Sequence, residues 1–350
     1  MAVDLSKLVV RRKISLEELR GRTVAIDAYN VLYQFLSIIR QPDGAPLVDT
    51  HGNVTSHLSG LFYRTIDLME QGIRPIYVFD GVPSMLKQKT IEARMNRRAE
   101  AHEAWQKAAA AGNIEEARMH AQAATRITKE IVASARELLD LMCVPYVNAA
   151  SEGEAQATYM CKNGIAYAVG SQDYDTMLLG APHVVRNLGF SGRRKLPKRN
   201  VYVNVEPELV SLDETLQSLG LTQRQLIWVG IMLGTDFNDG IKGIGPKGAL
   251  KIARQSKSIE DMERLVMEKS GTPFASDVRA VESMFLEPEV NDVDPAAIER
   301  RFADMPLSER LVKFLCDKHD FGLERIEKQA ERLSRIKSGP KQKGIGGWIS

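Results

Sequence analysis

Short apolar runs rich in β-branched residues alternate along this chain with longer segments whose apolar residues recur at helical spacing. Three of these runs, residues 23–27, 76–80 and 166–170, are expected to be strands, each followed by a turn or a helix. Strands that alternate with helices favour a parallel sheet. We therefore expect an α/β fold with a mixed, largely parallel central sheet and helices on both faces.

Acidic residues follow these predicted strands and a further short apolar run at 145–149. They are Asp27, Asp80, Glu152, Glu154, Asp173 and Asp175. In open α/β sheets, ligands bind at the edge formed by the carboxyl ends of the strands. Two carboxylates about 4 Å apart repel by roughly 4 kcal/mol at an effective dielectric near 20, so they either turn into solvent or share a cation. Oxygen ligands of this kind suit Mg²⁺ or Mn²⁺.

A single aspartate at a strand end has a second interpretation, because it is more often the N-cap of the next helix than a metal ligand. That interpretation applies to Asp27 and Asp80 taken one at a time. Three strands that each deliver acids to the same edge of a sheet favour convergence instead. The sequence therefore predicts one acidic edge that could hold a cation.

Residues 84–111 form an alanine-rich helical segment that lacks an apolar stripe. Lys87, Arg94 and Arg98 share one helical face of this segment. It is either an ordinary solvated helix or an element that stands off the core and guides a phosphate backbone. The pattern alone leaves both interpretations open.

A second helix is expected after Gly112, which breaks the pattern. Asn113 and Glu116 resemble a capping box at its start. Apolar residues then recur at helical spacing from Ile127 to Met142, so one continuous helix is expected to run to that point.

Two smaller segments have competing interpretations. The basic loop 191–199, which contains Arg194 and Lys195, is either a solvated turn or a phosphate contact. Thr55 and Ser56 can cap the helix expected at 58–71. For His57, capping or a surface position is favoured over contact with a ligand.

A glycine-rich segment lies at 234–249, between two apolar helices. Its sequence Gly243-Ile-Gly-Pro-Lys247 is a helix-hairpin-helix signature. The glycines let the backbone approach a phosphate, and the next helix presents free N–H groups toward it. Such contacts follow the DNA backbone without reading bases. A plain glycine-rich connector is the alternative, but the signature favours nucleic-acid binding, and Asp236 stands beside it as a further carboxylate.

Composition narrows the class of protein without changing this picture. The 350 residues are 44% hydrophobic and 26% charged, which is ordinary for a soluble globular protein. Cys143, Cys161 and Cys316 show no paired spacing, so they are expected to be free thiols in a reducing compartment. Nothing approaches 18 consecutive apolar residues and no signal peptide is evident. An intracellular, cytoplasmic protein is therefore expected.

Taken together, these motifs resemble those of the flap structure-specific endonucleases of archaeal type, within the XPG-like nuclease family. The resemblance extends over essentially the whole chain, and its pieces are jointly specific although each is weak alone. They lie at residues 25–28, 55–64, 78–81, 97–100, 151–155, 172–175, 234–236 and 243–247.

The resemblance implies the PIN-like 5′-nuclease fold in a single domain, residues 1–335. That domain would begin with an N-terminal nuclease part (1–83) and an inserted helical arch (84–135). An internal nuclease part (136–258), with the helix-hairpin-helix at about 226–256, and a C-terminal helical part (259–335) would follow. Residues 336–350 would form a flexible tail.

The resemblance also implies an activity. A member of this family removes 5′ flaps at junctions of single- and double-stranded DNA by two-metal-ion hydrolysis, with 5′–3′ exonuclease activity, in Okazaki-fragment maturation and repair. Lys87 and Arg94 would be catalytic residues at the base of the arch. Two Mg²⁺ ions, for which Mn²⁺ could substitute, would be held by seven acids. Those acids are Asp27, Asp80, Glu152, Glu154, Asp173, Asp175 and Asp236.

DNA contacts are implied at further positions. Tyr33 would stack on a base near the cleavage site, residues 55–57 would lie where a short 3′ flap is received, and the hairpin would grip duplex DNA with the help of a monovalent cation. The implied DNA-binding residues are Tyr33, Thr55, Ser56, His57, Arg64, Arg97, Arg98, Arg194, Lys195, Gly243, Gly245 and Lys247.

Three positions depart from the family pattern. Ala2 stands where glycine is common, and Phe237 stands where tyrosine is usual. The tail resembles a box that binds a sliding clamp of the PCNA type, but its second aromatic residue is replaced by isoleucine, so weakened clamp binding is expected. The box residues are Gln342, Ile345, Trp348 and Ile349.

Two other functions remain open at this point. A related nuclease could resolve four-way junctions or act mainly as an exonuclease, and only a panel of substrates separates these activities. A non-catalytic scaffold tethered to the clamp is disfavoured, because every motif carboxylate is present. The protein is expected to act as a monomer.

Overall fold

The computed structural model describes residues 3–41, 43–82, 84, 87–188, 192–195 and 202–338. For residues 88–89, 192–195 and 202–204 the description is limited to the backbone. The position of Ala2 and the clamp-binding box at 342–349 lie outside the described residues.

A seven-stranded mixed sheet forms the centre of the molecule, in the order β1-β9-β6-β5-β2-β3-β4. Strand β2 pairs in parallel with β3 on one side and with β5 on the other, while β9 is antiparallel to both β6 and β1. The strands span Arg11–Lys13 (β1), Thr23–Asp27 (β2), Arg74–Phe79 (β3), Tyr146–Asn148 (β4), Ala168–Gly170 (β5), His183–Arg186 (β6) and Glu208–Ser211 (β9). The expected α/β fold is confirmed.

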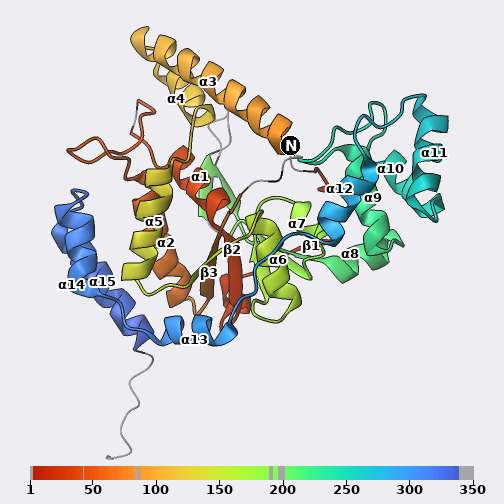
Figure 1. Ribbon diagram of the computed structural model, residues 1–350. Coiled ribbons are helices and arrows are strands. Elements are labelled where there is room, and N and C mark those ends of the chain that lie inside the picture. Colours follow the sequence, from red (N-terminus) through yellow and green to blue (C-terminus); the bar gives the residue numbers. More distant parts are fainter. Residues whose placement is uncertain are drawn as a thin grey trace, which may run out of the picture.

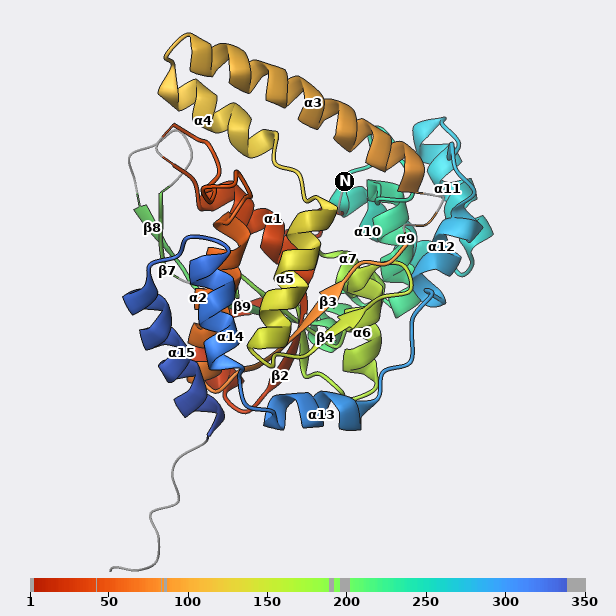
Figure 2. The same cartoon turned by 60° about the vertical axis from the view of Figure 1, so that its left-hand side comes forward.

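Each face of this sheet has its own apolar core, because successive side chains on a strand point to opposite faces. On β2, Ala25 joins one core, while Val24 and Ile26 join the other. The first core holds helices α6 (Gly153–Lys162), α7 (Asp175–Leu178), α9 (Gln223–Leu233) and α12 (Val278–Leu286). The second holds α1 (Ala28–Ile38), α2 (Ser56–Glu70), α5 (Lys129–Leu141) and α15 (Leu323–Lys337). Figures 1 and 2 show these two groups of helices on either side of the sheet.

The remaining elements extend this body. Helix α8 (Leu212–Leu219) follows β9, and α10 (Pro246–Gln255) and α11 (Ile259–Ser270) lie near α9 and α12 at one end of the molecule (Figure 1). Helices α13 (Pro295–Ala303) and α14 (Ser308–Val312) lead to α15 at the other end. Strands β7 (Gly192–Lys195) and β8 (Tyr202–Val205) form a separate two-stranded antiparallel ribbon, so this part of the expected basic loop is a strand, which contains the backbone of Arg194 and Lys195.

Helices α3 (Gln88–Ala110) and α4 (Ile114–Ala123) form a pair that projects from this body (Figures 1 and 2). Among the described side chains of α3, only Ala108 is buried. Gly112 turns the chain with a φ of 71°, and Asn113 accepts a hydrogen bond from the Glu116 amide, as its position predicts. The segment therefore stands off the core and is largely exposed to solvent, and its contact with a phosphate backbone stays a prediction.

The expectation of one helix from residue 113 to Met142 is wrong. Helix α4 ends at Ala123, and Thr128 caps a new helix, α5, by accepting a hydrogen bond from the Ile131 amide. Because the apolar stripe of α5 packs against the body while α4 projects, the chain must change direction between them. Thr128 lies at the start of α5, so a capping residue marks the change.

Two further expectations can be compared with the structure. The three cysteines are free thiols, and two of them, Cys143 and Cys161, are buried. No helix in the described part of the chain is long and apolar enough to cross a membrane.

Candidate active site

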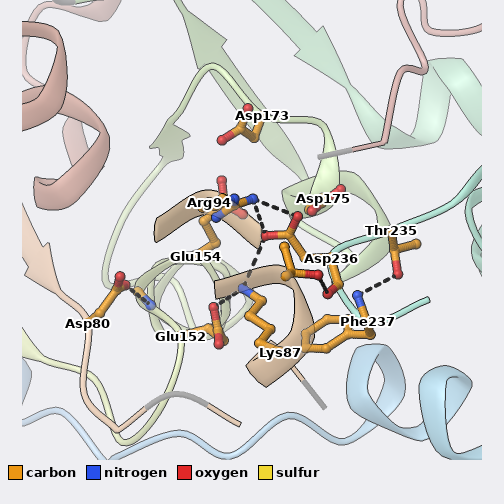
Figure 3. Close-up of polar contacts among 12 residues, drawn as sticks. Asp80, Lys87, Arg94, Glu152, Glu154, Asp173, Asp175, Thr235, Asp236 and Phe237 are labelled. Atoms are coloured by element: carbon orange, nitrogen blue, oxygen red, sulfur yellow. Dashed lines mark hydrogen bonds and ion pairs between the residues drawn. The ribbon is translucent and has the colours of Figure 1, made fainter. Parts of the chain in front are cut away.

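The predicted acidic edge exists, and the strand register builds it. Strands β5, β2, β3 and β4 are neighbours that run in parallel, so the acids that follow them arrive at one edge of the sheet. Asp236 joins them from the loop after α9. In Figure 3 the first turns of α3 lie among six of these acids, which are Asp80, Glu152, Glu154, Asp173, Asp175 and Asp236.

Several of these acids are held by backbone amides. Asp27 is the N-cap of α1 and accepts a hydrogen bond from the Asn30 amide at 3.0 Å. Asp80 accepts one from the Gly153 amide at 2.7 Å, and Asp175 accepts one from the Val3 amide at 2.9 Å. The N-cap interpretation of Asp27 is therefore confirmed, and the same carboxylate also lies at the acidic edge, where its role as a metal ligand stays a prediction.

Sequence reasoning missed three residues that shape this edge. Gly153 is required because a Cβ there would lie 2.7 Å from the Asp80 carboxylate. The Ser171 hydroxyl donates to Glu154 at 2.7 Å and accepts from the Asp173 amide at 3.1 Å. Asn30 donates to the Asp173 carboxylate at 3.4 Å. Their positions, each within three residues of a motif acid, were the available signal.

Burial and mutual repulsion disfavour the charged forms of these acids. Burial, and then the charge of Asp80, raise the pKa of Asp27 to about 8. Burial raises the pKa of Asp80 to about 6 and that of Asp175 to about 7. The pKa of Glu154 is raised well above its ordinary value by burial and then by Asp173. The edge therefore stores unfavourable electrostatic energy that a cation would relieve.

Two basic residues of the α3 segment already reach into the acids. Lys87 forms ion pairs with Glu152 and, at 3.6 Å, with Asp236. Arg94 donates to both carboxylate oxygens of Asp236, at 2.7 and 2.8 Å. The pKa of Asp236 lies below its ordinary value although burial raises it, and Arg94 and Lys87 are among the groups that lower it. Figure 3 shows both side chains pointing at Asp236.

The donor set fits a hard divalent cation, because it consists of carboxylate oxygens whose charges two basic side chains cannot balance. Among the residues that the structure describes, no three His, Cys, Asp or Glu side chains are arranged so that they could hold a metal ion. Glu152 and Asp236 are at present paired with Lys87 and Arg94. A bound ion would therefore have to take these two carboxylates from their present partners.

The raised pKa values lead to a prediction about the metal-free protein. A folded-state pKa above the unfolded value means that the folded state binds more protons, so stability falls as pH rises. The window runs from about pH 4, the ordinary carboxyl value, to the folded values of about 6 to 8 for Asp80, Asp175 and Asp27. With a chelator present to keep the protein metal-free, we expect its melting temperature to fall by roughly 5 °C between pH 5 and pH 8.

Thermal melts with and without a divalent cation test this prediction. The cation should flatten the pH dependence, and Glu154→Gln should also reduce it, because that change removes a buried charge. A pH dependence that is the same in wild type and in Glu154→Gln would show that the acidic edge is not its source.

The residues expected to contact a 3′ flap are buried in this structure. Ser56 accepts a hydrogen bond from the Leu47 amide, and His57 is 1% exposed and hydrogen-bonded to the Ser134 hydroxyl at 2.7 Å. Thr55 is also buried and makes no side-chain capping bond. The expectation that His57 caps the helix or lies on the surface is wrong, because α5 packs over it. Contact between these side chains and DNA would require this region to open.

The other residues expected to contact DNA have different surroundings. The Arg98 guanidinium lies 5.7 Å from the centre of the Tyr33 ring, which brings α3 and α1 together beside the acids. Arg97 is exposed on α3. Arg64, in contrast, is partly buried and donates to the Leu188 carbonyl. The side chains of Arg194 and Lys195 lie outside the description.

The helix-hairpin-helix prediction agrees with the local structure. Helices α9 and α10 flank the segment, Gly243 has a φ of 88°, and Gly245 is the N-cap of α10 with Pro246 in its first turn. A Cβ added at either glycine would meet no atom within 4 Å, so both face open space. Lys247 is exposed beside them. The hairpin thus presents backbone and positive charge outward.

Comparison with known proteins agrees with this geometry. The XPG N-terminal domain matches residues 3–101 and the XPG I-region matches residues 143–236. Flap endonuclease 1 of Pyrococcus furiosus is 50% identical over 100% of this chain and 99% of its own length. The structure of flap endonuclease-1 from Methanococcus jannaschii is 38% identical, covers 96% of this chain and 99% of its own, and has a TM-score of 0.73.

A more distant structure shares the fold alone. The catalytic core of Rad2 in complex with DNA substrate is 22% identical, covers 95% of this chain and 100% of its own, and has a TM-score of 0.68. The family matches cover the strands, the acids and the first part of α3, and the full-length similarity covers the hairpin as well. The chain therefore belongs to the flap endonuclease 1 family of XPG-type, metal-dependent nucleases.

Proposed function

We propose that this protein removes 5′ flaps from branched DNA and that its seven clustered acids hold two divalent cations, with Mg²⁺ as the ion used. The observation that carries the proposal is the position of Lys87 and Arg94. These two basic side chains lie between the acids and the projecting helices. The Lys87 ammonium is 3.6 Å and the Arg94 guanidinium 2.7 Å from the Asp236 carboxylate. A scissile phosphate that approaches the acids would meet both of them.

The protein's own groups would then have separate tasks. Asp27, Asp80, Glu152, Glu154, Asp173, Asp175 and Asp236 would hold the ions, which when bound supply an activated water and stabilise the leaving oxygen. Lys87 and Arg94 would exchange their present carboxylate partners for the phosphate oxygens. Because a guanidinium and an ammonium both form strong charge-assisted bonds to phosphate, the exchange would orient the phosphate over the acids.

Grip on the DNA would come from surfaces outside the acid cluster. The exposed backbone around Gly243 and Gly245, with Lys247 and a monovalent cation, would hold the phosphates of the duplex. Tyr33 would stack on a base, and the exposed Arg97 would add positive charge along α3. The projecting pair α3 and α4 supports a single-stranded flap as the substrate, since it leaves a charged, weakly apolar element above the acids.

The biological setting is proposed from the family. Flap removal would serve Okazaki-fragment maturation and repair, with an accompanying 5′–3′ exonuclease activity. The protein would act as a monomer tethered to a PCNA-type clamp by residues 342–349, with the affinity weakened by Ile349. Titration of a 338–350 peptide against the cognate clamp measures that contact directly.

A panel of end-labelled substrates tests the proposed function. It comprises a double flap with a 5′ flap and a one-nucleotide 3′ flap, a four-way junction and a blunt duplex, each with Mg²⁺ and with EDTA. We expect metal-dependent incision near the base of the 5′ flap and little cutting of the other two. Preferential cutting of the four-way junction would assign the protein to the junction-resolving relatives instead. Tight flap binding without any cutting would support the scaffold.

A further inference from the structure

A cavity of about 480 Å³ opens beside the acid cluster, and its apolar wall has no part in the roles described so far. It lies between Val82, Ser84 and Lys87 on one side and the start of α6 and the end of α12 on the other. Glu152, Glu154 and Asp175 form part of its wall, so it is continuous with the acidic edge. Its volume falls within the range of about 300 to 1,000 Å³ typical of small-molecule sites.

The inner wall of this cavity is apolar and aromatic. Phe237, Phe285, Met284 and Leu179 line it. The Phe237 ring packs edge-to-face on Phe285, with ring centres 5.4 Å apart, and the Lys87 ammonium lies 5.1 Å from its centre. Phe237 therefore connects the lysine at the acid cluster to the apolar wall. A flat, apolar group could pack on this wall while attached to a phosphate at Lys87.

The outer wall is acidic, because Glu287 and Glu289 line the cavity and are exposed. Together with the motif acids, they make the cavity unfavourable for a second phosphate. A nucleobase meets both conditions, since it offers an apolar face to the aromatic wall and, in adenine, cytosine and guanine, an exocyclic amino group to a carboxylate. Thymine lacks that amino group.

Helix α3 places this cavity opposite a second aromatic residue. Lys87 lies over Phe237 and Arg98 lies over Tyr33, with Arg94 on Asp236 between them. Eleven residues separate Lys87 from Arg98, which corresponds to about 16 Å of helix. A scissile phosphate at Arg94 would thus have an aromatic ring on either side. If Tyr33 stacks on the base on one side, the Phe237 cavity remains for the base on the other.

We propose that this cavity is a nucleobase subsite that receives the base of the nucleotide departing with the flap, on the far side of the scissile phosphate from Tyr33. The inference rests on the proposed function. The subsite packs the base on Phe237 and Met284 and favours bases with an exocyclic amino group through Glu287 and Glu289. It would hold the departing base and thereby set the position of the phosphate.

Single-turnover cleavage with an abasic analogue tests the subsite on the full-length protein with Mg²⁺. The analogue is moved one position at a time through the nucleotides on both sides of the cleavage site of the double-flap substrate. In wild type, loss of the departing base should slow cleavage about five- to tenfold, which corresponds to the lower end of what stacking of one base contributes. The same analogue further out in the flap should have little effect.

Met284→Trp fills the cavity and provides the matched variant. The variant should cleave the intact substrate only as fast as wild type cleaves the abasic substrate. On the abasic substrate itself, the variant and wild type should have the same rate. Met267→Trp is the control, because Met267 is an exposed methionine on α11, 49% exposed. Glu287→Gln combined with Glu289→Gln should reduce the preference for cytosine over thymine at the departing position.

The outcomes separate the two proposals. Equal cleavage of intact and abasic flaps by wild type would overturn the subsite while leaving flap cleavage established. Persistent sensitivity of Met284→Trp to the missing base would also overturn it. Absence of flap cleavage by wild type would instead overturn the proposed function. Because the wild-type series alone can refute the subsite, a poorly folded Met284→Trp does not prevent a decision.

Discussion

Asp173→Asn is expected to reduce flap cleavage by about three orders of magnitude or more while DNA affinity stays the same or increases. Asp173 is the appropriate acid to change, because its carboxylate bonds to the Asn30 side chain rather than to a backbone amide. Asp27, Asp80 and Asp175 each accept a backbone hydrogen bond, so their loss would also disturb the fold. An asparagine can still accept from Asn30, and the change removes one negative charge.

The cleavage rate and the DNA affinity are expected to respond differently to this substitution for an electrostatic reason. A carboxylate that holds a catalytic ion acts on the transition state, where loss of about 4 kcal/mol costs three powers of ten in rate. Affinity for DNA comes from contacts with phosphates elsewhere, which the change leaves in place. Removal of an acid next to the DNA should, if anything, favour binding.

Single-turnover rates and equilibrium titrations with a double flap measure the two effects separately. Asp213→Asn is the control, because Asp213 is an exposed aspartate on α8. It should match wild type in both measurements. A variant at Asp173 that loses affinity in proportion to its cleavage rate would show that the acid serves binding and would contradict its assignment as a metal ligand.

Lys87→Ala is expected to lower the single-turnover rate by about two orders of magnitude with affinity for DNA changed less than about threefold. Burial opposes the charge of Lys87, but Glu152 and Asp236 raise its pKa, so it remains an ammonium at neutral pH. Its ammonium is thus available to the phosphate through the whole pH range of an assay. The same charge pairs with the acids in the free protein, where it would compete with a metal ion for Glu152.

That competition gives a second measurement. Lys87→Ala should reach half-maximal cleavage at a lower metal concentration than wild type, even though its maximal rate is lower, because Glu152 and Asp236 lose a cationic partner. Lys107→Ala, near the end of the same helix, removes a lysine of α3 far from the acids and is the control. Unchanged single-turnover cleavage in Lys87→Ala would show that the lysine has no role in the chemistry.

Much of this fold can be read from the chain because its signals are local. Apolar runs of β-branched residues predicted β2, β3 and β5, and the acids that follow them predicted the edge at which they meet. The helix-hairpin-helix segment could also be predicted from the sequence, because Gly243 adopts a φ of 88° that favours glycine. Asn113 marked the start of α4 as a cap. In each case the residue type and its immediate neighbours determine the conformation.

The structure corrected the expectations that depended on distant neighbours. Helical spacing could not show that the chain turns before Thr128, because only packing of α5 against the body requires that turn. The sequence around His57, in the first turn of α2, did not indicate that α5 would cover this side chain and leave it 1% exposed. Burial of this kind is decided by which elements meet, and periodicity within one element does not record it.

The sequence by itself determined which acids exist, where each follows its strand, and to which family the chain's motifs point. Only the tertiary structure decided the electrostatics of the site. It set the pairing of Lys87 and Arg94 with Glu152 and Asp236, the contact of Asp80 with Gly153, and the cavity beside Phe237. The physical reason is that desolvation and Coulomb energies depend on distances between residues far apart in the chain, and those distances exist only once the sheet has assembled.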